Sequence, residues 1–154
     1  MPVPSLGQQV MVGKLPTTFE ILADQVANAY SVVRQIIPPA VLMLPHAHEN
    51  EDQVAIVLRG QLGVLVGQRE WTVGAGEIAV RPRGLVHSVW NSTNEEVEIL
   101  EITSPGDFEH YFMAMGDLTA REALAQAPQL AAEWKIRQSP DLAARLAEQY
   151  DVSL

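Results

Sequence analysis

The chain has 154 residues, enough for one domain that buries most of its apolar surface. Its net charge of −9 argues against a nucleic-acid partner, because phosphate binding needs clustered Lys or Arg, and these are few and scattered here. The absence of cysteine excludes disulfides, thiolate metal sites and a cysteine nucleophile, so any metal must be held by nitrogen and oxygen.

The N-terminal sequence and the lengths of the apolar runs indicate the cellular location to expect. Residues 1–4 do not join a basic patch to an apolar core, as a secretory signal would. No apolar run approaches the length needed to cross a bilayer. We therefore expect a soluble, cytoplasmic protein without a membrane partner.

The first predicted elements are two β-rich segments, residues 17–22 and 31–37. Pro38 and Pro39 end the second segment, since proline cannot donate a hydrogen bond to a β-ladder. Residues 24–30, between the two, are compatible with a loop or a turn of helix, and periodicity does not decide.

Short apolar segments then alternate with polar or glycine-containing turns. The expected strands are residues 42–48, 53–58, 62–66, 70–73, 78–80, 86–90 and 97–103. This spacing is typical of an all-β barrel or sandwich, and the lack of helical crossovers excludes a parallel α/β fold. Gly76 and Gly84 lie in turns where we expect a positive φ.

After residues 104–106 the pattern becomes helical. Aromatic and apolar residues recur at the spacing of one helix face, at Phe108, Tyr111, Phe112 and Met115. We expect them first to pack the helix on the sheet, and only secondarily to line an apolar pocket.

Two more helices are predicted toward the C-terminus. Thr119 and Glu122 form a capping box that opens the first, which Pro128 is expected to interrupt. Pro140 begins the second. One face of this last helix carries Leu142, Leu146 and Tyr150.

His46 and His48 lie two residues apart in an expected strand, so their side chains share one face. Imidazole is the commonest metal-binding side chain, and His87, on another strand, would supply a third nitrogen. An isolated His-x-His is more simply interpreted as two strand histidines without an ion. The motif around His87 favours metal binding instead.

The spacing of these residues defines two motifs. The first is His46-x-His48, four residues, Gln53, six residues and Gly60. The second is Gly76, five residues, Pro82-x-Gly84, two residues, His87, three residues and Asn91. Together they resemble the two signature motifs of the cupin superfamily. The second motif matches at every fixed position, whereas the first has Ala40 where the family usually has glycine and Gln53 where it usually has glutamate.

The resemblance implies an all-β fold, the cupin double-stranded β-helix or jelly-roll barrel, with a C-terminal helical extension. Residues 1–154 would form a single cupin domain, with the barrel at about residues 17–104 and the helices at about residues 106–150. In the family, the two motifs place three histidines and one carboxylate around a metal inside the barrel. The implied ligands here are His46, His48, His87 and Gln53.

Gln53 can offer an amide oxygen to a metal, but no charge. A bound divalent ion would then be less well compensated, so metal affinity should fall and bound water should become more acidic. Glu49, Glu51 and Asp52 lie nearby, but a solvated turn is the expected environment for all three. If Glu51 were the acid ligand, the number of residues between it and Gly60 would not match the first motif.

Three imidazoles and an amide oxygen suit a divalent transition metal, namely Ni, Fe, Cu, Co or Zn, better than Mg or Ca. We assign no catalytic residue from the sequence. We expect Asn91 to end a strand or turn rather than bind metal, and Arg59, Arg81 and Arg83 to lie on the surface rather than in the cavity. His110 is expected to be solvated.

Residues 103–112 and 142–150 resemble the C-terminal extension of single-domain cupins related to quercetin dioxygenases. In that family the metal binds a flavonol or similar enolate, and dioxygen is inserted to open the ring. The family glutamate also accepts the substrate proton, for which Gln53 has no basic lone pair.

The leading hypothesis is therefore a metal-dependent dioxygenase acting on a small aromatic or enolisable, quercetin-like compound. The expected apolar wall of its cavity consists of Leu42, Leu44, Val57 and Val89. The alternative is a non-oxidative cupin with a redox-inert metal, which binds a small ligand or acts as an isomerase or lyase. A metal-free structural cupin is the least favoured hypothesis. Because cupins commonly dimerise through sheet edges, we also expect a homodimer.

Overall fold

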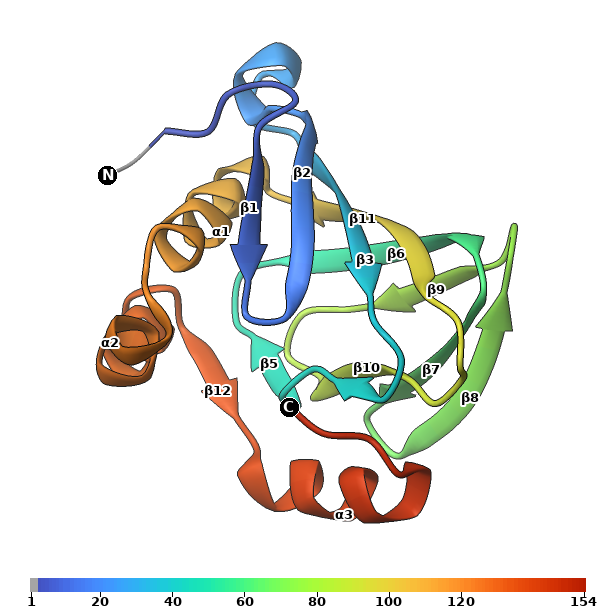
Figure 1. The fold of residues 1–154 in the computed structure, drawn as a ribbon. Helices are drawn as coiled ribbons and strands as arrows, with labels where there is room; N and C mark the ends of the chain where they lie inside the picture. Colours follow the sequence, from blue (N-terminus) through green and yellow to red (C-terminus); the bar gives the residue numbers. More distant parts are fainter. Residues whose placement is uncertain (1–2) are drawn as a thin grey trace.

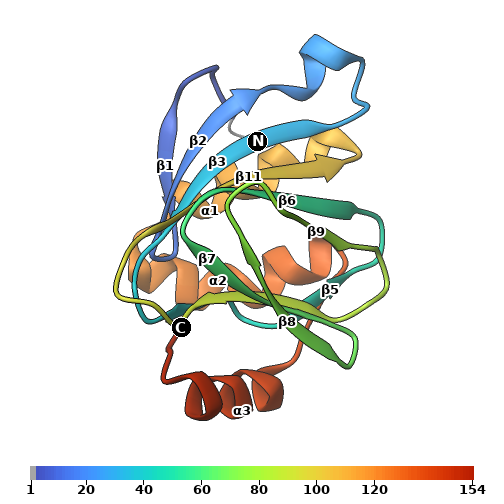
Figure 2. The same ribbon diagram turned by 90° about the vertical axis from the view of Figure 1, so that its right-hand side faces the viewer.

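The structure of the protein, a computed structural model, describes residues 3–154 apart from the side chain of Ala120. Its strands form two antiparallel sheets that pack face to face, followed by a helical C-terminal region (Figures 1 and 2). One sheet has the spatial order β1 (Gln9–Val12), β2 (Leu15–Ile21), β3 (Ser31–Ile37), β11 (Val97–Ser104), β6 (Asp52–Arg59) and β9 (Ile78–Arg81). The other has the order β12 (Ile136–Gln138), β5 (His46–His48), β10 (His87–Asn91), β7 (Gln61–Val66) and β8 (Arg69–Gly74), with β4 (Val41–Leu42) also paired to β10. The all-β prediction is confirmed.

The alternation of buried residues along the strands explains the packing of the two sheets. In β6 and β11 every second residue is buried, as expected for strands with one face on a core. The core between the sheets contains mainly β-branched residues, among them Ile37, Val57, Val64, Val89 and Ile99. These residues favour a pleated, buried surface.

The last helix, α3 (Pro140–Tyr150), covers the outer face of the second sheet (Figure 1). Every residue of β10 is buried, because one face meets the opposite sheet and the other meets α3. Trp90 packs in the same cluster as Leu146, and its ring stacks on Tyr150 with 4.6 Å between the centroids. The predicted start of this helix at Pro140 and its apolar face are confirmed.

The other helical elements are η1 (Ala23–Val26), η2 (Gly106–Phe108), α1 (Glu109–Gly116) and α2 (Ala120–Glu133). Phe108 and Phe112 pack against Phe19 and Val33, so the aromatic helix docks on β2 and β3 as predicted. No helix in the described part of the chain is long and apolar enough to cross a membrane.

The capping box at the start of α2 is confirmed, but the predicted interruption at Pro128 is wrong. The Thr119 amide donates to Glu122 Oε2 at 2.8 Å, and the Glu122 amide donates to Thr119 Oγ1 at 3.3 Å. The helix continues through Pro128 to Glu133. Pro128 and Leu124, whose carbonyl loses its helical donor, are both exposed, so water can satisfy that carbonyl.

Two strands were not predicted, and one predicted strand is divided. β1 precedes the first expected strand and pairs with β2 through a tight turn at Gly13. β12 pairs with β5, which places Ile136 opposite His48 and Gln138 opposite His46. The segment expected at residues 42–48 is divided into β4 and β5, because Pro45 has no amide hydrogen to donate.

Candidate metal centre

The second sheet brings three histidines together on one face. β5 presents His46 and His48, and β10 pairs with β5 so that His87 lies directly opposite His46. Ring centroids are 4.5 Å apart for His46 and His87, 4.7 Å for His46 and His48, and 5.3 Å for His48 and His87. One ring nitrogen from each residue lies within 4.8 Å of the others. The predicted convergence is confirmed, and the three histidines can bind a metal.

A backbone hydrogen bond from a glycine turn connects the second motif to the first. Gly84 has a φ of +82°, as predicted, and Gly76 has a φ of +85°. The turn lets the Gly84 amide donate to the carbonyl of His48 at 2.7 Å. The position of His48 is thus linked to the turn that precedes His87.

Hydrogen bonds orient the imidazole rings for metal binding. His46 Nδ1 lies 2.7 Å from the carbonyl oxygen of Leu44, and His87 Nδ1 lies 3.3 Å from that of Leu85. Because carbonyls only accept, Nδ1 carries the hydrogen in both rings and Nε2 keeps its lone pair.

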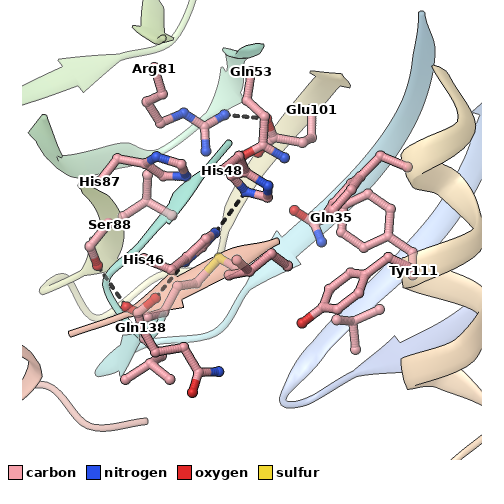
Figure 3. Close-up of a pocket in the computed structure, with 17 residues that line it drawn as sticks. Gln35, His46, His48, Gln53, Arg81, His87, Ser88, Glu101, Tyr111 and Gln138 are labelled. Atoms are coloured by element: carbon pink, nitrogen blue, oxygen red, sulfur yellow. Dashed lines mark hydrogen bonds and ion pairs between the residues drawn. The ribbon is translucent and has the colours of Figure 1, made fainter. Parts of the chain in front are cut away.

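The freed Nε2 atoms have no suitable partner within the protein. His46 Nε2 lies 3.0 Å from His48 Nε2, and His87 Nε2 is buried with no hydrogen-bond partner (Figure 3). A buried acceptor without a donor is unfavourable, and a cation at this point would satisfy all three nitrogens. The residues present therefore fit a bound metal ion.

The surroundings also keep the imidazoles of His46 and His87 neutral, which is the form that binds metal. Burial lowers the pKa of His46 to about 4, with a further contribution from the nearby His48. Burial likewise lowers the pKa of His87, and the neighbouring His46 and Arg81 lower it further. Protons therefore do not compete for either ring near neutral pH.

Glu51 is buried rather than solvated, contrary to the prediction, with only 3% of its surface exposed. Its Oε2 lies 3.3 Å from His48 Nδ1, the nitrogen on the far side of the ring from His46. The two atoms are not hydrogen-bonded, so Glu51 is placed to polarise the His48 ring electrostatically and lies on the side of the ring away from the other histidines. Carboxylates in this position raise the basicity of a histidine ligand.

We predict that Glu51→Gln lowers metal affinity by about 10- to 100-fold, because an amide polarises the His48 ring less than a carboxylate does. The measurement is a titration of the metal-free protein with Co²⁺ or Zn²⁺ in competition with a chelating dye. Glu49→Gln is the matched control, since Glu49 is exposed two residues away. Equal affinities in the two variants would contradict this role.

Gln53 reaches the site from the facing sheet. It is buried on β6, and its amide nitrogen donates to Thr103 Oγ1 at 3.2 Å. Its side chain points toward His48 (Figure 3), and the amide oxygen is the atom left to face the cluster. Its role as a fourth ligand stays a prediction.

The histidines line a cavity of about 130 Å³ between the two sheets. Leu44 and Val89 form part of its apolar wall as predicted, together with Phe108 and Phe112 of the helical region. The other two expected wall residues lie elsewhere, since Leu42 packs beneath α3 and Val57 belongs to the core between the sheets. The polar wall also includes Gln35, Tyr111 and Gln138.

The prediction that Arg81 lies on the surface is wrong, because Arg81 is buried in this cavity, where it forms an ion pair with Glu101. Each has 3% of its surface exposed, and Arg81 Nη2 donates to Glu101 Oε1. Burial raises the pKa of the Glu101 carboxyl, and the Arg81 guanidinium opposes that rise. The burial of Glu101 could have been predicted from strand alternation, because Glu101 lies on the same face of β11 as the buried Ile99 and Thr103.

Other residues considered in the sequence analysis lie outside the cluster. Arg59 and Arg83 are exposed, as predicted. Asn91 ends β10, and its amide group donates to the carbonyls of Ile37 and Glu95 at 2.9 and 2.7 Å, as expected for a residue with a structural role. His110 is half-buried rather than solvated, and its Nδ1 is buried without a hydrogen-bond partner.

Comparison with known proteins agrees with this geometry. The family model described as a cupin domain matches residues 33–103, which include all three histidines and Gln53. No curated protein matches the chain in sequence.

Three solved structures illustrate the shared fold. A predicted oxalate decarboxylase from Thermotoga maritima is 19% identical, covers 64% of this chain and 90% of its own, and has a TM-score of 0.59. KdgF from Halomonas sp. is 17% identical, with a TM-score of 0.57, and the alignment covers 64% of this chain and 86% of KdgF. A sugar phosphate isomerase from a cupin superfamily, from Silicibacter pomeroyi, is 23% identical, with a TM-score of 0.50. The alignment covers 57% of this chain and 59% of the isomerase chain. The chain therefore has the cupin double-stranded β-helix fold, and the match of residues 33–103 to the cupin-domain model supports a place in the cupin superfamily.

Proposed function

We propose that the protein is a metal-dependent cupin dioxygenase acting on a small aromatic or enolisable compound. The observation that carries this proposal is the convergence of three imidazole Nε2 atoms on a cavity with an aromatic wall. His46, His48 and His87 would hold the metal, and the Gln53 amide oxygen would be the fourth protein ligand. The C-terminal segment that resembles quercetin dioxygenase-like cupins supplies Phe108 and Phe112 to the wall.

The protein would contribute binding, orientation and the exclusion of water. A bound redox-active metal supplies the electron transfer that lets a closed-shell enolate react with dioxygen. Phe108 and Phe112 provide flat apolar surfaces for a ring, and they keep water from the reacting atoms. Gln35 and Tyr111 offer polar groups on the wall beside them.

In the described part of the chain, no free carboxylate lines the cavity to deprotonate a substrate. Among the described residues that line it, Glu101 is the only carboxylic acid, and it is paired with Arg81. Gln53 has no basic lone pair at the position where the family has glutamate. The substrate is therefore expected to enter the cavity already ionised.

The direct test is dioxygen uptake, measured with an oxygen electrode on protein loaded with Fe, Ni, Cu or Co. We expect uptake with at least one member of a panel of flavonols, diketones and catechols. Uptake should disappear in His48→Ala, which removes a buried ligand, and persist in His110→Ala, which changes the histidine outside the cluster. Uptake that survives in His48→Ala would refute the proposal.

A second candidate function is non-oxidative, with a redox-inert metal. Gln53 favours it, because the amide cannot accept a proton as the family glutamate does. The titles of two structural neighbours, a predicted oxalate decarboxylase and a sugar phosphate isomerase, name a lyase and an isomerase. Elemental analysis of protein purified from its own host decides between the candidates: zinc alone supports the second, and near-stoichiometric Fe, Ni, Cu or Co supports the first.

We also propose that the protein is a homodimer. β1 is an outer strand of its sheet, and Met11 on it has 50% of its surface exposed. An outer strand leaves backbone donors and acceptors free to pair with a second chain. Light scattering is expected to give twice the chain mass of 16.9 kDa, and the mass of one chain would refute the dimer.

A further inference from the structure

The charged groups around the candidate metal site do not balance a divalent ion. Arg81 and Glu101 are the only oppositely charged pair among the described residues of the cavity wall, and they neutralise each other. Glu51, behind His48, contributes one negative charge. A divalent ion would therefore leave one positive charge uncompensated, and protonation of Glu101 would only enlarge this excess. A glutamate at position 53 would remove it, but this chain has Gln53.

We propose that a small organic monoanion, a carboxylate or an enolate, binds between the histidine cluster and Arg81 and supplies the negative charge that Gln53 lacks. This inference rests on the proposed function and specifies its substrate class. It makes metal binding and anion binding mutually dependent, because the anion neutralises the positive charge that the metal brings into the site, and that positive charge attracts the anion.

Arg81 has the donors that such an anion needs. A guanidinium has five N–H groups, and Arg81 uses Nη2 for Glu101 while its Nε is buried without a hydrogen-bond partner. The guanidinium lies between Glu101 and His87 (Figure 3).

The cavity also limits the size of the anion. Its volume of about 130 Å³ is close to that of an engineered protein cavity of about 150 Å³ that binds benzene. The part of the ligand that lies inside the cavity is therefore about the size of one six-membered ring. Phe108 and Phe112 suit the faces and edges of such a ring. Benzoate has this size and charge, and benzamide is its neutral analogue.

Thermodynamic linkage makes the inference measurable. If metal raises the affinity for benzoate by some factor, benzoate must raise the affinity for metal by the same factor. We expect a factor of at least about 5, the lower end of typical coupling between two ligands. Benzamide, which has the same shape without the charge, should change metal affinity by less than about 2-fold.

The experiment is calorimetric titration of the metal-free protein with Co²⁺, in buffer alone, with saturating benzoate and with benzamide. Gln53→Glu should bind Co²⁺ more tightly in buffer alone and lose the benzoate effect. The double variant Arg81→Met, Glu101→Gln removes both partners of the pair together, and it should keep Co²⁺ binding while losing most of the affinity for benzoate.

The outcomes separate this inference from the proposed function. Equal effects of benzoate and benzamide, or a benzoate effect that persists in Gln53→Glu, would overturn the inference while leaving the metal centre intact. Failure to bind Co²⁺ under every condition, in a protein whose circular dichroism shows it folded, would overturn the metal centre and the proposed function with it. Coupling without dioxygen uptake by any redox-active form would support the anion site and favour the non-oxidative candidate.

Discussion

Replacing His87 with glutamine is expected to remove most of the stabilisation of the protein by added metal. A metal ion at 100 times its dissociation constant stabilises a folded protein by about 2.7 kcal/mol. For a domain of this size, that corresponds to a rise in Tm of roughly 5–11 °C. His87 should carry much of this effect, because its Nε2 is a buried acceptor with no partner in the protein. Thermal unfolding of chelator-treated protein with and without Zn²⁺ measures the shift.

The control for this prediction is the remaining histidine of the chain. His110→Gln should keep the full rise in Tm, since His110 lies outside the cluster of His46, His48 and His87. Comparing each variant with and without metal cancels any effect of the substitution on the metal-free protein. A rise in His87→Gln equal to that of the unmodified protein would show that the metal binds elsewhere.

Phe108→Ala is expected to reduce the free energy of unfolding by about 3–5 kcal/mol, the usual cost of removing a buried phenylalanine ring. Phe108 has 1% of its surface exposed. Its ring centroid lies 4.9 Å from Tyr111, 5.2 Å from Phe112 and 4.8 Å from His48. The substitution therefore removes the ring contact that His48 makes with the helical region.

Urea unfolding provides the measurement, with the slope m expected to stay unchanged. The matched control is Leu124→Ala on α2, because Leu124 has 83% of its surface exposed and should change the free energy by no more than about 0.5 kcal/mol. A loss below about 1 kcal/mol in Phe108→Ala would mean that η2, which carries Phe108, does not pack on the sheet as described. Such a result would also mean that Phe108 does not form part of the aromatic wall of the proposed site.

Local patterns in the sequence were enough to predict the histidine cluster. His46 and His48 share a face because strand geometry alternates side chains, and this holds whatever the strand pairs with. The spacing of the second motif then identifies His87. The capping box of Thr119 and Glu122 is also a local interaction, so it could be predicted without tertiary contacts.

The polar surroundings of the cluster could not be predicted in the same way. Glu51 looks like a member of a solvated turn until the fold places the far side of the His48 ring beside it. Arg81 and Glu101 come from β9 and β11, on either side of β6, and each charge is tolerated in the interior only because of the other. Burial of a charge depends on its partner, and adjacent sequence does not reveal that partner.

Residue type and short spacing were sufficient to predict the strand-rich fold, the histidine cluster and the glutamine at position 53. The groups that surround the histidines became apparent only in the folded chain. β12 lies beside β5 through hydrogen bonds between segments about ninety residues apart in sequence. Such pairing depends on the fold as a whole, because the same three-residue segment would have no partner strand in isolation.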